Sequence, residues 1–187
     1  MQKERETTLE EGTQREGSEG VVTEKTCRMC RQTKPVTLFN TYVMRGSDVA
    51  KKHCVECEVE KEKSLTLRAY LQHLVEKSRD RVGYMHKVYA GDYEINADFL
   101  LQLWREQNGR CAMTGLPLRW QKTEEEVRAN KWGKFLVSID RIDSDLNYLR
   151  SNVRLTASAI NFMQSNLTDT EFIFLCKCVA EGEEKWE

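Results

Sequence analysis

The sequence predicts an α+β protein in three folded parts: a small cysteine-rich module, a helical connector, and a C-terminal unit of short strands and helices. Three observations predict this order. Two Cys-x-x-Cys pairs stand near the N-terminus, a helical repeat of apolar residues follows them, and strand-like runs alternate with further helical repeats toward the C-terminus. A chain of 187 residues can form one domain or two small ones, with a modest core.

Residues 1–24 are predicted to be a disordered tail. They are rich in Glu, Gly, Thr and Gln, and such a segment buries too little apolar surface to fold. The start of the chain has no apolar export signal, and no apolar run is long enough to span a membrane. We therefore expect an intracellular protein in a reducing compartment, where seven cysteines favour metal binding over disulfides.

Residues 25–60 are predicted to form a zinc ribbon. Cys27 and Cys30 make the first pair, and Cys54 and Cys57 make the second. Each pair presents two thiolates from one turn, and two pairs complete a closed tetrahedral site for one structural Zn²⁺. Zinc also supplies folding free energy to a module with little core of its own. A redox pair or ordinary buried cysteines are the alternatives.

Residues 61–92 are predicted to be a basic, helical connector. A single helix is expected from Glu58 to Arg81, because apolar residues recur there at helical spacing. Residues 26–90 carry thirteen Lys and Arg against seven Asp and Glu, whereas residues 1–25 carry four against seven. This excess favours a nucleic-acid partner, although a solvated basic surface explains it equally well.

Residues 93–187 are predicted to form the C-terminal unit. A helix is expected over 97–107, with Asn96 as its N-cap. A hairpin is expected within 111–140, with strands over 116–120 and 135–139. The capping-box spacing of Thr123 and Glu126 predicts a short helix between those strands.

Two more helices are expected near the C-terminus. The first should start near Leu155 and use Ile160 and Met163 on its apolar face. The second should start after Asp169 and bury a set of apolar side chains, namely Phe172, Leu175, Cys176 and Val179.

A group of polar residues between these elements could bind a divalent metal. Asp140 ends a strand with a carboxylate, a hard ligand suited to Mg²⁺, and Asn161 on the following helix could face it. Asn147 can adopt a positive φ, and Asn152 is placed to brace the loop with side-chain hydrogen bonds. Ordinary turn and cap residues are the alternative interpretation.

The stretch from 107 to 164 resembles the HNH, or His-Me finger, nuclease family, especially its small versions in phages and large DNA viruses. The resemblance covers about the last ninety residues, and a four-cysteine ribbon with Leu38-Phe39 after its first pair is also common in such proteins. The matching motifs are Gln107 through Gly115, Ser138 through Asp143, Tyr148, Asn152-Val153, Asn161 and Met163. The resemblance implies a ββα-metal module, with flanking helices, that cuts phosphodiester bonds with Mg²⁺ or Mn²⁺.

The resemblance also implies roles for single residues. Asp140 would be a metal ligand on the first strand, Asn152 would hold the loop, and Asn161 would occupy the position of a second ligand on the helix. Arg141 stands where the family often has the histidine that activates water. Arginine stays protonated, so it could bind the scissile phosphate instead, and Asp143 could substitute as the base.

The sequence thus favours a metal-dependent DNA endonuclease acting on double-stranded DNA, slowed by Arg141. Basic residues expected to contact the DNA backbone are Lys51, Lys52, Arg68, Arg141, Arg150 and Arg154. Two alternatives remain open: a catalytically inactive DNA-binding protein on the same fold, and a zinc-stabilised adaptor for other proteins.

Overall fold

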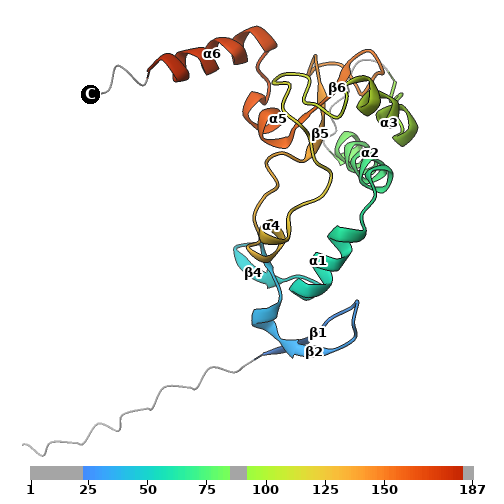
Figure 1. Cartoon of the computed structure of the whole chain (residues 1–187), viewed down its shortest axis with the longest axis vertical. Coiled ribbons are helices and arrows are strands. Elements are labelled where there is room, and N and C mark those ends of the chain that lie inside the picture. The colour runs from blue at the N-terminus through green and yellow to red at the C-terminus, as the bar shows by residue number, and fades with distance from the viewer. Residues whose placement is uncertain (1–22, 85–91, 183–187) are drawn as a thin grey trace, which may run out of the picture.

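The structure is a computed structural model that describes residues 23–84 and 92–182. The cysteine module lies at one end of an elongated molecule and the C-terminal unit at the other (Figure 1). The predicted disordered tail lies outside the described residues except for its last two positions. No helix in the described ranges is long and apolar enough to cross a membrane.

The cysteine module consists of two antiparallel hairpins and the start of a helix. Its elements are β1 (Glu24–Thr26) paired with β2 (Thr33–Pro35), a 3₁₀ turn (Val36–Leu38), β3 (Thr41–Met44) paired with β4 (Ser47–Ala50), and α1 (Val55–Ser64). Arg45 and Gly46, both with positive φ, make the tight turn between β3 and β4. The buried core of this module is small and consists of Cys27, Phe39 and Cys54.

The connector is two helices rather than the predicted single one. After α1, the chain is extended at Leu65, and α2 (Leu67–Tyr84) begins beyond it. The Thr66 hydroxyl accepts a hydrogen bond from the Ala69 backbone N–H, as a capping residue does. The side chains of Trp120 and Gln121 donate to the Leu65 carbonyl oxygen. A distant part of the chain therefore stabilises the break.

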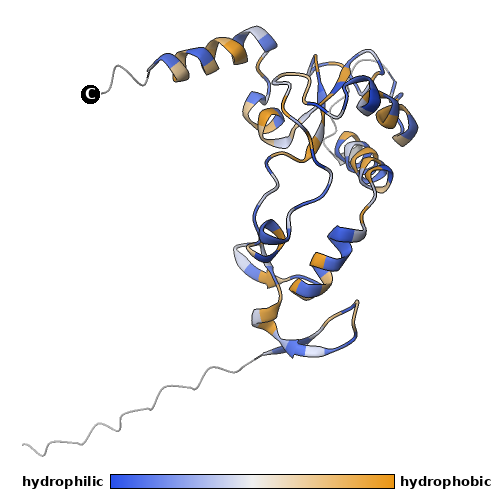
Figure 2. Ribbon diagram, in the orientation of Figure 1, coloured by the Kyte–Doolittle hydropathy of each residue, from blue (hydrophilic) through white to orange (hydrophobic). Residues whose placement is uncertain are grey.

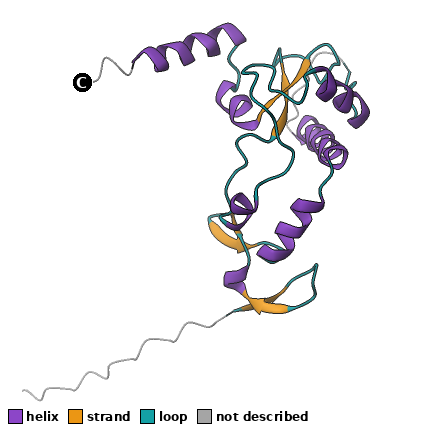
Figure 3. Ribbon diagram, in the orientation of Figure 1, coloured by secondary structure: helices purple, strands orange, loops and turns teal. Residues whose placement is uncertain are grey.

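Two short-range predictions in the C-terminal unit are confirmed. Helix α3 spans Ala97–Glu106, and the Asn96 side chain accepts a hydrogen bond from the Phe99 backbone N–H at 2.9 Å. Helix α4 spans Glu124–Arg128, and the side chains of Thr123 and Glu126 form the reciprocal capping box. Figure 3 shows the long loop that carries α4 away from the C-terminal unit toward the cysteine module.

The predicted hairpin pairing is wrong. Strand β5 (Val137–Arg141) pairs antiparallel with β6 (Val153–Ala157), whereas residues 116–120 make only isolated bridges. Leu155 is a fully buried strand residue opposite Ile139, so the helix expected near Leu155 starts later, as α5 (Ser158–Gln164). Helix α5 packs on both strands, and the order β5, β6, α5 makes a ββα unit.

A core of apolar side chains holds this unit together. Helices α2 and α3 pack over the β5–β6 hairpin, and the fully buried side chains include Leu71, Val75, Leu100, Val137 and Leu155. Burial of such residues is the main favourable term in folding.

The last helix does not bury the face predicted for it. In α6 (Asp169–Gly182), Phe172 is buried, but Leu175, Cys176 and Val179 are exposed. The helix projects away from the C-terminal unit and carries apolar residues along its length (Figures 1 and 2). Met163 on α5, also predicted to be in the core, is exposed. The periodicity correctly predicts a helix in both places, but the fold supplies no surface to cover these side chains.

Candidate functional site

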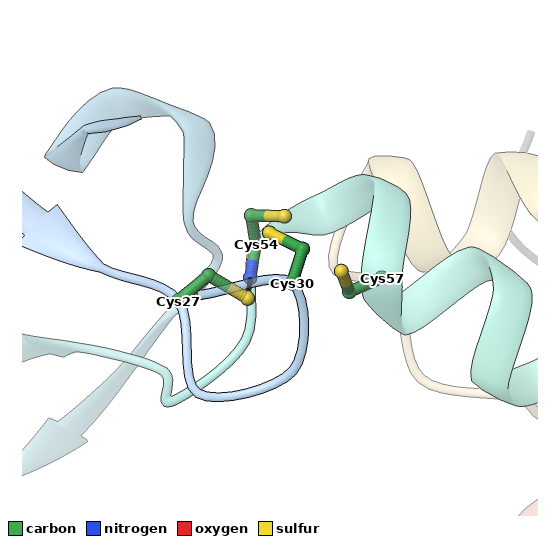
Figure 4. Close-up of side chains that lie close together, drawn as sticks. All are labelled: Cys27, Cys30, Cys54 and Cys57. Atoms are coloured by element: carbon green, nitrogen blue, oxygen red, sulfur yellow. Dashed lines mark hydrogen bonds between the residues drawn. The ribbon is translucent and has the colours of Figure 1, made fainter. Parts of the chain in front are cut away.

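The four predicted zinc ligands form a compact cluster. Their sulfur atoms all lie within 4.8 Å of one another, with Cys27 and Cys54 fully buried (Figure 4). Cys54 is the N-cap of α1, and its backbone N–H donates to Cys27 Sγ at 3.3 Å. Cys57 lies in the first turn of the same helix. The cluster could hold a metal ion, and four sulfur donors in this arrangement are consistent with structural zinc.

The electrostatics of the cluster fit a cation. Burial alone would raise the pKa of Cys27, but hydrogen bonds from the backbone of Cys54, Cys30 and Met29 lower it overall. Burial and hydrogen bonds to the neighbouring thiols raise the pKa of Cys57. The Lys34 ammonium lies 3.5 Å from Cys54 Sγ. Four thiolates this close together repel one another, so a bound cation would stabilise their ionised forms.

A second site lies at the ββα unit. Asp140 on β5 and Asn161 on α5 line one open groove of about 630 Å³. Three cationic side chains line the same groove: Lys77, Arg81 and Arg141. Asp140 is the only acid among the described residues that line it. The groove is therefore basic, with a single carboxylate set into it.

Asn161 is held rigidly against the strand. Its Nδ2 donates to Ser138 Oγ at 2.8 Å and to the Ile139 carbonyl oxygen at 2.9 Å. Its Oδ1 accepts no hydrogen bond from the residues that the structure describes. The amide oxygen therefore remains available as an acceptor or a metal ligand.

Asp140 is buried and paired with a cation. Arg154 Nε donates to Asp140 Oδ2 at 2.7 Å, and the two remaining guanidinium nitrogens each lie 2.6 Å from a carboxylate oxygen of Asp169. Burial raises the pKa of Asp140, and the hydrogen bond from Arg154 offsets part of that rise. Hydrogen bonding to Arg154 lowers the pKa of Asp169. Asp140 thus has one oxygen engaged by an arginine.

This geometry does not fit the predicted contact between Arg154 and a DNA backbone. Only 13% of the Arg154 side chain is exposed, and its guanidinium is surrounded by Asp140, Asp169 and Gln164. The sequence identifies Arg154 as a cation but cannot show that it points inward. Its partner Asp169 belongs to the first turn of α6, so Arg154 links that helix to the candidate site.

The loop between β5 and β6 is braced as predicted. Asn152 Oδ1 accepts from the Asp143 backbone N–H, and its Nδ2 donates to the carbonyl oxygens of Asp143 and Asn147. Asn147 is not among the described residues with positive φ. It is buried instead, and its Oδ1 accepts from the Tyr148 backbone N–H at 2.8 Å.

Arg141 lines the groove that contains Asp140, whereas Asp143 lines a different hollow. Arg141 Nη1 donates to the Leu146 carbonyl oxygen at 2.8 Å, and its guanidinium lies over the Tyr148 ring. Arg141 lines the groove that contains Asp140 and also a neighbouring hollow of about 340 Å³. Asp143 lines only the neighbouring hollow. The structure therefore brings Arg141, but not Asp143, into one groove with Asp140 and Asn161.

The other predicted backbone contacts are spread over the molecule. Arg68 forms an ion pair with Asp98, and Arg150 lies over the Phe99 ring. In the cysteine module, Lys51 pairs with Glu58 at 3.3 Å, and Lys52 is exposed on the same segment. None of these four lines the groove.

Sequence reasoning missed two pairs of groove residues. Lys77 and Arg81 are four positions apart, which places them on one face of α2, and that spacing could have been noticed. Trp132 and Phe162 gave no local signal, because their meeting at the groove depends on how the loop before β5 packs beside α5. No known protein family, curated protein or solved structure matches this chain.

Proposed function

We propose that this chain is a metal-dependent nuclease that cleaves DNA in the groove between α2, β5 and α5, and that a structural zinc ion holds its cysteine module. One observation carries the proposal. A carboxylate and an amide, Asp140 and Asn161, line a single groove together with the cations of Lys77, Arg81 and Arg141. The ββα order of these elements is the one that the resemblance to HNH nucleases implies, which supports the proposal.

The residues fit a divalent ion that substrate would complete. Mg²⁺ and Mn²⁺ prefer oxygen ligands and commonly bind through one or two protein groups together with water and phosphate. Such an ion would polarise the scissile phosphate and stabilise the leaving oxygen. Asp140 and Asn161 offer the oxygens, and Asn161 is already fixed by its bonds to β5.

The cations would hold the substrate by its phosphates. Lys77 and Arg81 project from α2 into the groove, where they can neutralise the backbone. Arg141, next to Asp140, can stabilise the negative charge that develops on the phosphate. Because arginine cannot accept a proton, water activation lacks a histidine here, and such a loss typically slows cleavage by about 10²- to 10⁴-fold.

A specific observation favours a second candidate, a DNA-binding protein without catalysis. Arg154 already engages Asp140 Oδ2, so a metal ion must either use the other oxygen or compete with the arginine. Together with Arg141 in place of the usual base, this pairing fits a groove that binds the backbone without cutting it.

Nicking of supercoiled plasmid with Mg²⁺, with Mn²⁺ and with no added divalent metal decides between the two, because omitting the metal leaves the structural zinc in place. We expect slow, metal-dependent nicking that Asp140→Asn abolishes and Asn161→Ala reduces. Asp48→Asn, at an exposed position on β4, is the matched control and should nick like the wild type. DNA binding without cleavage of either the plasmid or a single-stranded oligonucleotide, for any metal and at any pH, would establish the second candidate.

Arg141→His sharpens this test. If the missing base limits the rate, histidine should accelerate nicking near neutral pH, where it can accept a proton. If Arg141 mainly grips phosphate, the same change should weaken DNA binding and slow nicking. Either result identifies the role of this side chain within the proposed site.

A further inference from the structure

Two exposed aromatic side chains stand at the groove. Trp132 is 49% exposed and Phe162 is 76% exposed, and their ring centroids lie 5.6 Å apart in a T-shaped contact. Trp132 comes from the loop between α4 and β5, and Phe162 follows Asn161 on α5. Both line the groove that contains Asp140.

The apolar core does not include this pair. The partly buried rings that pack against the core cluster of the C-terminal unit include Trp104 and Trp120, in an edge-on contact at 5.9 Å, but not Trp132 or Phe162. Large aromatic rings left in water beside a polar groove forgo the stabilisation that burial would provide. Their placement therefore points to a ligand with flat, apolar faces.

We infer that Trp132 and Phe162 form a stacking platform for unpaired bases, so that the groove takes single-stranded nucleic acid. This inference rests on the proposed function and names its substrate class. Bases of a single strand can stack on aromatic rings, and cations along the same groove hold the phosphates between them. In a duplex the base faces are already stacked on one another, so the platform has nothing to contact unless a base is extruded.

A second hollow next to Trp132 could hold a further part of such a strand. Trp132 also borders a neighbouring hollow of about 320 Å³, lined by Phe135, Lys131, Lys134 and Glu126. Lys131 is paired with Glu125 at 3.0 Å, and Glu126 with Arg119 at 2.9 Å. A strand held by Lys77 and Arg81 could thus cross Phe162 and Trp132 and meet the exposed Lys134. Alternation of cations with aromatic rings is the pattern found in single-strand binding sites.

Binding of three labelled ligands tests the inference, measured by fluorescence anisotropy in buffer without Mg²⁺ or Mn²⁺, so that nothing is cut and the zinc of the cysteine module is retained. The ligands are a thymine oligonucleotide, a duplex of equal length, and an abasic strand with the same phosphates. We expect the thymine strand to bind most tightly. Trp132→Ala and Phe162→Ala should each weaken its binding about 5- to 140-fold, the range for losing one base stack.

Matched control variants show whether a loss of affinity comes from the missing aromatic ring or from a misfolded protein. Phe174→Ala removes a ring that is 64% exposed on α6 and does not line the groove, so it should not change affinity. Trp132→Phe keeps an aromatic face and should retain most of the affinity that Trp132→Ala loses. Circular dichroism checks that each variant is folded.

The outcomes distinguish this inference from the proposed function. If the duplex binds as tightly as the thymine strand, or the abasic strand does, the stacking platform is wrong while a nucleic-acid groove remains. If the two alanine variants bind the thymine strand normally, the platform is also wrong. If none of the three ligands binds, both the platform and the proposed function are wrong.

Discussion

The cysteine module and the C-terminal unit are stabilised in different ways. The buried core of the module has three residues, two of which are the metal-ligating candidates Cys27 and Cys54. The core of the C-terminal cluster has twelve buried residues contributed by α2, α3, β5, β6 and the segments between them. We expect the first region to depend on coordination of a metal ion by its cysteines, whereas the second is held by apolar burial.

Polar contacts join the two regions. Asn40 Nδ2 in the module donates to the Val127 carbonyl oxygen at the end of α4, and Asn130 Nδ2 donates to the Thr41 carbonyl oxygen, each at 2.8 Å. Helices α1 and α4 also pack together, and the buried apolar side chains on them are two valines, Val59 and Val127. We therefore expect loss of the metal to unfold the module while the C-terminal unit stays folded.

The largest expected effect is that of metal removal. Structural zinc contributes about 10–16 kcal/mol in small zinc-dependent modules, so chelation or Cys27→Ser should abolish the folded module. Hydrogen exchange measured along the chain should show lost protection in β1 to β4 and retained protection in β5 and β6. Cys176→Ser, at an exposed position on α6, is the control.

The metal content gives an independent check on this difference. Elemental analysis of protein purified without chelator should show one zinc per chain. Zinc-free protein with a fully protected module would contradict the assignment. Simultaneous loss of protection in both regions would show that they fold as one unit.

Breaking the buried ion pair of the C-terminal unit should cause the next largest loss of stability. Arg154→Met leaves Asp140, 8% exposed at its side chain, without its cation, and breaking such a pair costs about 3–5 kcal/mol. Urea unfolding measures this loss, and zinc content should not change. Arg150→Met, at an exposed arginine nearby, should cost far less. Equal stability of the two variants would show that Asp140 does not need Arg154.

A cavity in the apolar core should have a comparable or smaller effect. Leu155 is fully buried on β6, and replacing such a leucine by alanine costs about 2–5 kcal/mol. The loss should appear in the urea unfolding of the C-terminal unit and leave zinc content intact. Leu116→Ala, at a side chain that is 48% exposed, is the control. A change in zinc content in Leu155→Ala would contradict independent stabilisation.

The smallest expected effect is that of the α4 cap. Thr123→Ala removes the side-chain half of the capping box, which is worth about 0.5–2 kcal/mol. Because α4 contacts the module, protection should fall in α4 and at its junction with Thr41, but not in β5. Thr170→Ala, at an exposed threonine in the first turn of α6, should leave that protection unchanged. Unaltered protection in Thr123→Ala would show that tertiary contacts alone hold α4.

The sequence by itself predicts the features that depend on near neighbours. The four cysteines, the Asn96 cap of α3 and the capping box of α4 are all in place. The caps and each Cys-x-x-Cys pair are local arrangements, in which the spacing of two or three residues decides which atoms can meet. The two cysteine pairs meet across 27 residues of chain, and their meeting is predicted because one tetrahedral ion needs four ligands. The bracing of the β5–β6 loop by Asn152 belongs to the same group, since its partners lie within nine residues.

Only the tertiary structure decides the pairing and the exposure of the remaining elements. Apolar alternation makes Phe135–Ile139 a strand candidate, but it cannot choose between two partners, and β6 is chosen because its buried residues complete the core. The sequence shows that Arg154 is a cation. Its inward direction follows from the pairing of β5 with β6, because that pairing sets Arg154 opposite Asp140. Trp132 and Phe162 likewise meet only after the loop and α5 have packed. Contacts between distant segments depend on the whole arrangement of the core, so no local pattern encodes them.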